Sequence, residues 1–117
     1  MATIISLAEA KSLTQEYQQQ NSALGGPGLL TPASQFLNGF FIDRTSLEDM
    51  LSNTSVVGIS IDIAKDAAFK GQPVNIFNLV VVGAQPNLGG VTGYTYVATG
   101  NIYSDWPPCP TICTNLG

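Results

Sequence analysis

The chain has 117 residues, of which only 10% are charged, well below the level of about 25% that is usual in globular proteins. Its net charge is −4 and its four cations are scattered, whereas nucleic acids and anionic membranes bind basic patches, so we expect neither as a partner. It contains no histidine, which excludes Ser-His and Cys-His nucleophile pairs and imidazole metal ligands, on which many enzymes depend.

The N-terminal segment has no basic start and meets Glu9 before any long apolar run, unlike a secretory signal peptide. We therefore expect a chain that is cytoplasmic as synthesised, and export by a signal-independent machine stays open. Ser6 and Glu9 have the spacing of a capping box, and apolar residues recur at helical intervals after them. This pattern predicts a helix over about residues 7–20, broken by Asn21 and Ser22.

A loop, a short strand and a short helix are predicted next. The segment from Asn21 to Ser34 is rich in glycine and proline and is interpreted as a surface loop, a mobile cover or a small-ligand element. Gly39–Ile42 is interpreted as a short strand. Thr45 and Glu48 repeat the capping-box spacing and predict a second, short helix that ends near Asn53.

Two longer strands follow. In Val56–Ala64, residues Val57, Ile59, Ile61 and Ile63 alternate with small or polar residues, which predicts one buried face and one face in water. In Val74–Gly83 the apolar residues occupy both alternation phases, which predicts the central strand of the sheet, covered on both faces. The short connection between the two segments predicts antiparallel pairing.

The last predicted elements are one strand and a tail. Tyr94–Ala98 and Asn101–Tyr103 flank Thr99-Gly100 and are interpreted as one bulged strand, with a tight hairpin as the alternative. Three prolines after Asp105 predict a tail without regular structure. We therefore expect a single domain over residues 1–105, followed by a Pro/Cys-rich tail over residues 106–117.

The tail carries the residues most open to a functional interpretation. Cys109 and Cys113 could form a local disulfide, bind a soft metal if subunits share the site, or act as a redox pair. The disulfide or an inert tail is favoured, because the chain offers no histidine or further cysteine to complete a zinc site and redox pairs usually have two intervening residues. Trp106 either anchors the tail on the domain or, if it is exposed, forms a rigid segment together with Pro107 and Pro108 that binds a partner protein.

The sequence offers only weak evidence for active-site residues. Five carboxylates could form an acid/base pair or a cation site, but their spacing matches no cation-binding loop, and helix caps and solvated faces explain them; they are Asp43, Glu48, Asp49, Asp62 and Asp66. The segment Gly89–Gly93 lacks the Lys-Ser/Thr that a phosphate-binding loop requires. We therefore predict no catalytic, cofactor-binding or metal-binding residue and no enzymatic activity.

The order of elements resembles that of a group of small bacterial proteins without an assigned function. The likeness is carried by Ile-Ser-Leu-Ala-Glu-Ala at the first helix, by Gly58–Ile61 and Leu79–Gly83 in the strands, and by Ile102-Tyr103 followed by the Cys-Pro tail through Cys113. Because the group has no assigned activity, the resemblance implies no cofactor and no site residue.

Together these patterns predict an α+β fold: a small, mostly antiparallel sheet of three to five strands, with the N-terminal helix on one face and a second short helix. The low charge and the lack of a recognisable site predict a non-catalytic structural or protein-interaction module that associates with copies of itself. The alternative is a thiol-based redox or metal-binding protein that uses the Cys pair.

Overall fold

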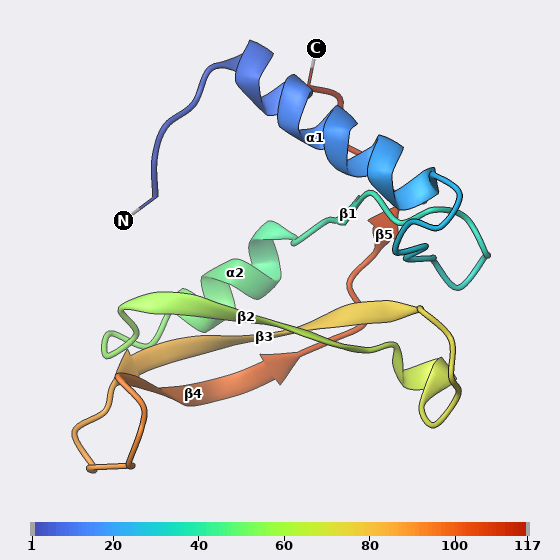
Figure 1. Cartoon of the computed structure of the whole chain (residues 1–117). Helices are drawn as coiled ribbons and strands as arrows, with labels where there is room; N and C mark the ends of the chain where they lie inside the picture. The colour runs from blue at the N-terminus through green and yellow to red at the C-terminus, as the bar shows by residue number, and fades with distance from the viewer. Residues whose placement is uncertain (1, 117) are drawn as a thin grey trace. The chain divides into compact units, whose positions relative to one another are not determined.

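The structure, a computed structural model, describes residues 2–116. It confirms a mixed α+β fold whose strands pair antiparallel in two sheets, ordered β1-β5 and β2-β3-β4 (Figure 1). The elements in chain order are α1 (Leu7–Ser22), β1 (Gly39–Phe40), α2 (Arg44–Leu51), β2 (Gly58–Lys65), the 3-10 turn η1 (Ala67–Phe69), β3 (Phe77–Pro86), β4 (Tyr96–Tyr103) and β5 (Pro108–Cys109).

The chain forms two compact units. The first contains the described residues up to Phe41, the segment Gln72–Ile76 and the described residues from Pro107 onward; the second contains Ile42–Gly71 and Phe77–Trp106. Helix α1 belongs to the first unit and the three-stranded sheet to the second, so the packing of the helix on that sheet stays a prediction. The division into a domain and a tail after residue 105 stays a prediction as well.

Helix α1 begins where the sequence predicts, because the Glu9 N–H donates to the Ser6 hydroxyl at 3.0 Å. The predicted break at Asn21 and Ser22 is wrong, since the helix continues through both residues. Asn21 is buried, and its side chain donates to the Leu29 carbonyl at 3.0 Å and accepts from the Leu29 N–H at 2.7 Å. These bonds fix the following loop to the last helical turn.

The same loop is held on its other side by backbone bonds. The Leu30 N–H donates to the Asn75 carbonyl at 2.8 Å, and Leu30 bridges to both Phe36 and Ile76. Strand β1 pairs with β5, so the predicted absence of regular structure in the tail is wrong at Pro108 and Cys109. A proline is tolerated there because β5 has only two residues and needs few ladder hydrogen bonds.

Strand β3 is the central strand of the three-stranded sheet, as predicted. It pairs with β2 from Lys65↔Phe77 to Gly58↔Ala84, and its neighbours Val81 and Val82, which point to opposite faces, are both buried. Its predicted start at Val74 is wrong, because residues 74–76 belong to the first unit.

Strand β4 is a single bulged strand, so the hairpin alternative is excluded. Its partners on β3 shift between Val82↔Ile102 and Gly83↔Thr99, and the extra residues include Gly100 at a φ of 79°. A positive φ is accessible to glycine without strain, which explains its position in the bulge.

Helix α2 begins two residues earlier than the capping-box match predicts. Its N-cap is Asp43 instead of Thr45, and the Ser46 N–H and hydroxyl donate to the Asp43 carboxylate at 2.9 and 2.8 Å. The backbone bond from Ser46, and then the hydroxyl bond, hold the pKa of Asp43 below its usual value. The helix packs on β3 and β4.

Candidate functional site

A polar cluster of the second unit links α2 to β4. The Tyr103 hydroxyl donates to Asp49 Oδ2 at 2.5 Å, and the Asn101 amide donates to the same oxygen at 3.1 Å. The bond from Tyr103, followed by that from Asn101, lowers the pKa of Asp49, while the bond to Asp49 raises the pKa of Tyr103. Both pKa values are shifted further from neutral pH. The pair is therefore suited to holding α2 against β4 and unsuited to acid–base catalysis at neutral pH.

The predicted sulfur pairing is present. Cys109 and Cys113 lie at disulfide-bonding distance, joined by a turn in which the Pro108 carbonyl accepts from the N–H groups of Thr111 at 2.5 Å and Ile112 at 2.9 Å. Among residues 2–116, no group of three or more histidine, cysteine or acidic side chains is placed to hold a metal ion. The redox and metal-binding interpretations of the pair stay predictions.

Trp106 is buried, with 3% of its surface exposed. Asn78 binds its backbone from both sides: the amide donates to the Trp106 carbonyl at 3.1 Å and accepts from the Trp106 N–H at 2.9 Å. The indole centroid lies 6.1 Å from that of Tyr103. This burial agrees with the anchoring interpretation and removes the exposure that a partner contact by Trp106 requires; Pro107 and Pro108 are half-buried.

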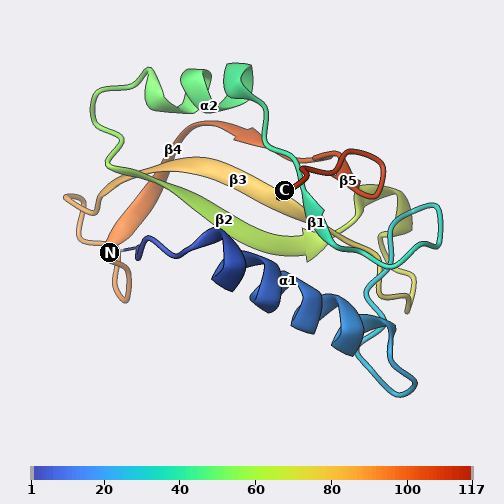
Figure 2. The ribbon, with the colours of Figure 1, turned by 90° about the horizontal axis from the view of Figure 1, so that it is seen from above.

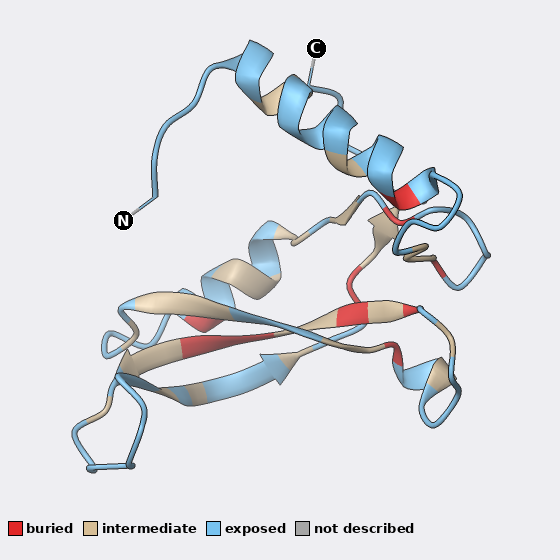
Figure 3. Ribbon diagram, viewed as in Figure 1, coloured by how far each residue is buried: buried red, intermediate tan, exposed pale blue. Residues whose placement is uncertain are grey.

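The apolar side chains of β2 and of the residue before it lie in water, contrary to the prediction of a buried face. Val57 is 61% exposed, Ile61 is 52% exposed and Ile63 is 81% exposed, and only Ile59 of the alternating set is half-buried. Figure 3 shows the middle of β2 as exposed while β3 beside it is buried. Contiguous large apolar side chains in water are a common feature of protein interaction surfaces.

The length of α2 explains this exposure. An eight-residue helix is about 12 Å long, whereas the eight residues of β2 span about 26 Å. The helix contacts β3 and β4, and Figure 2 shows it on the β4 side of the sheet. Its backbone reaches Gly83, the partner of Ile59, where an added Cβ would lie 3.3 Å from the Met50 carbonyl. Ile61 and Ile63 lie beyond that point, so nothing in the helix covers them.

Strand β2 also forms an open edge of the sheet. In the part of the chain that the structure describes, no strand pairs with the outer side of β2, and β2 pairs with β3 without a bulge (Figure 1). The opposite edge, β4, is interrupted by its bulge. Regular, apolar edge strands readily pair with another chain, whereas bulges discourage such pairing.

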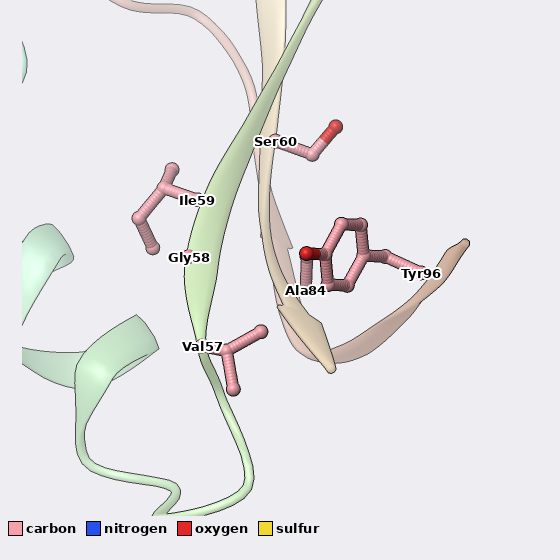
Figure 4. A pocket seen from close by; sticks show the side chains of 6 residues that line it. All are labelled: Val57, Gly58, Ile59, Ser60, Ala84 and Tyr96. Carbon is pink, nitrogen blue, oxygen red and sulfur yellow. The ribbon is translucent and has the colours of Figure 1, made fainter. Parts of the chain in front are cut away.

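A hollow of about 350 Å³ lies beside this edge. Figure 4 shows Tyr96 and Ser60 on one side of the sheet and Ile59 on the other side, where α2 lies. The hollow is lined by Val57, Gly58, Ile59, Ser60, Ala84 and Tyr96. Its side chains offer two hydroxyls and no carboxylate, amine or thiol, so the hollow adds apolar surface beside the edge and has no group suited to acid–base chemistry near neutral pH.

These edge residues were missed as a surface because alternation reveals that a face is apolar, but not what covers it. The second helix, expected to end near Asn53, is too short to cover a strand from Val56 to Ala64. The sequence prediction assigned the cover of the sheet to the N-terminal helix, which belongs to the other unit.

Comparison with known proteins adds no relative. The chain matches no protein-family model, no curated protein and no solved structure. Over residues 2–116, neither helix combines the length and the apolarity that crossing a membrane requires. The resemblance to small bacterial proteins stays a prediction.

Proposed function

We propose that this chain is a non-catalytic interaction module that associates with copies of itself through β2. The observation that carries the proposal is the exposure of Ile61 and Ile63 on a regular strand whose outer edge is unpaired among the described residues. The low charge of the chain supports it, because surfaces with few charges repel their copies weakly.

The energy available from these side chains sets the expected strength of association. Full burial of an isoleucine side chain is worth about 1.5–3 kcal/mol. With the exposures of Ile61 and Ile63, covering both would give about 3 kcal/mol per copy, or about 6 kcal/mol per pair. The entropy lost on association opposes this gain, so edge hydrogen bonds must add to it and we expect a dissociation constant in the micromolar range or weaker.

Light scattering coupled to size-exclusion chromatography tests the proposal at loading concentrations from about 10 μM to about 1 mM, which bracket that range. We expect the mass of the wild type to rise with concentration. Ile63→Lys should keep the monomer mass, because it places a charge on the exposed strand. The matched control is Ile102→Lys on β4, where the isoleucine is 64% exposed and should tolerate lysine without loss of association.

Two results would count against the proposal. A wild-type chain that stays monomeric at the highest concentration would exclude self-association at useful strength. Equal loss of association in Ile63→Lys and Ile102→Lys would remove the assignment to β2.

The thiol alternative retains one observation, the proximity of the two sulfurs. A structural staple needs the same proximity, so the pairing does not favour redox chemistry over stability. Self-association is therefore the function that the geometry supports best.

A further inference from the structure

We infer that β2 pairs antiparallel with β2 of a second copy, about a two-fold axis that is perpendicular to the sheet and passes midway between the two copies of Ile61. The inference rests on the proposed self-association and adds its register and symmetry. The partner is another copy of this chain because the edge is complementary to itself in one register, as the pairing of its side chains shows.

Directly opposed residues of a strand pair have their side chains on the same face of the sheet, and this restricts the choice of register. A register that set each residue opposite a residue of the other alternation phase would place isoleucines opposite side chains of the other face, which the pleat of a sheet does not allow. One residue must therefore lie opposite its own copy, and pairing at Ile61 or at Asp62, the two central residues of β2, joins the most residues.

The carboxylate of Asp62 decides between these two registers. A register in which Asp62 lies opposite its own copy would bring the two carboxylates together, and like charges opposite one another destabilise a sheet. The register in which Ile61 lies opposite its own copy instead places Asp62 opposite Ser60 of the other copy, whose hydroxyl can donate to the carboxylate. The two Ser60–Asp62 pairs lie on the face that carries Tyr96 and the hollow.

The other face gains a continuous apolar row in the same register. Ile61 meets its own copy, and Ile59 of each chain meets Ile63 of the other, so the most exposed isoleucine of β2 packs against a half-buried one. A two-fold axis perpendicular to the sheet leaves both α2 helices on this same face. The isoleucine row then fills the part of the face that each short helix leaves open.

Site-directed cross-linking tests the register in a Cys109→Ser/Cys113→Ser background. Directly opposed residues of an antiparallel pair have Cα atoms about 4.5–5.5 Å apart, within the range of about 4.4–6.8 Å that a disulfide spans. Ile61→Cys should therefore give a covalent dimer on mild oxidation. Ile63→Cys is the matched control, because its two copies would lie about 13 Å apart along the strands and should stay monomeric.

A charge pair at the predicted contact provides a second measurement that needs no thiol. Ser60→Lys places a cation opposite Asp62 of the other copy and should tighten self-association several-fold at low salt. Ser60→Asp places an anion there and should weaken it several-fold, because opposite charges across a strand pair stabilise a sheet and like charges destabilise it. High salt should bring both variants toward the wild type.

The outcomes separate the register from the proposed function. A wild type that never associates overturns both. A wild type that associates, with equal cross-linking of Ile61→Cys and Ile63→Cys or with equal affinity of the two Ser60 variants, overturns the register and leaves self-association standing. Selective cross-linking at position 61 together with opposite effects at position 60 establishes the pairing.

Discussion

The side chain of Asn78 hydrogen-bonds in the way a backbone peptide group would, between β3 and the segment that follows β4. Its amide donates to the Trp106 carbonyl at 3.1 Å, and its oxygen accepts from the Trp106 N–H at 2.9 Å and from the Leu79 N–H at 2.7 Å. Both Asn78 and Trp106 are buried. Asn78→Ala would leave the polar backbone groups of Trp106 without these partners in a site that water reaches poorly.

The expected loss follows from the number of orphaned groups. A buried donor or acceptor left unpaired costs about 1–3 kcal/mol. With the N–H and the carbonyl of Trp106 both affected, we expect the free energy of unfolding to fall by about 2–6 kcal/mol. This is a large part of the 5–15 kcal/mol that is typical of native proteins, at about the same scale as deleting a core side chain.

Urea unfolding followed by tryptophan fluorescence measures this loss, because Trp106 is the single tryptophan and lies at the altered contact. The matched control is Asn101→Ala, which removes one exposed hydrogen bond to Asp49 and should cost less than about 1 kcal/mol. Equal losses in the two variants, or a loss below about 1 kcal/mol for Asn78→Ala, would refute the reasoning.

Three further predictions concern packing, loop anchoring and pH. Gly83→Ala should lower the free energy of unfolding by about 1–3 kcal/mol, because its Cβ would lie 2.9 Å from Val56 Cγ2. Asn21→Ala should lower it by about 2–4 kcal/mol, measured by circular dichroism of the helices, because two groups of the following loop lose their partner. In urea titrations, the wild type should have a higher free energy of unfolding than Tyr103→Phe, and this difference should stay constant around neutral pH. It should fade below about pH 4, as Asp49 becomes protonated through its lowered pKa, and above about pH 10, as Tyr103 ionises through its raised pKa.

Each of these three has a control within the chain. Gly58→Ala is matched to Gly83→Ala, since no atom lies within 4 Å of its added Cβ, and similar losses would contradict the close-approach argument. Gln20→Ala is an exposed helical neighbour of Asn21 and should be nearly neutral. A difference between wild type and Tyr103→Phe that stays constant from acid to alkaline pH would show that the hydrogen bond contributes nothing to stability.

Local patterns predicted the elements well where the deciding interaction lies within a few residues. The Ser6 cap, the central strand through Val81 and Val82, and the bulge at Gly100 follow from spacing and from backbone freedom. The start of α2 was missed because Asp43 is also a strong capping residue, and a capping-box match two positions later gives a similar signal.

Features that depend on distant segments were not predictable in the same way. Asn21 looks like a helix breaker in sequence, but eight residues later Leu29 supplies the partners that keep it helical. Val74–Ile76 have the composition of strand residues, but Ile76 bridges to Leu30. Both residues belong to the first unit, whereas β3 belongs to the second. The exposure of β2 depends on how far α2 extends over the sheet, and the alternation of apolar and polar residues along a strand does not contain that information.

The bulge at Gly100 limits how far an assembly built on β2 can grow. In a pair of chains joined along β2, the regular edge strand of each chain is paired, and the bulged strand β4 forms each edge of the shared sheet. Further chains would have to add to that irregular backbone. The bulge therefore favours a finite complex of defined stoichiometry over an open-ended fibre.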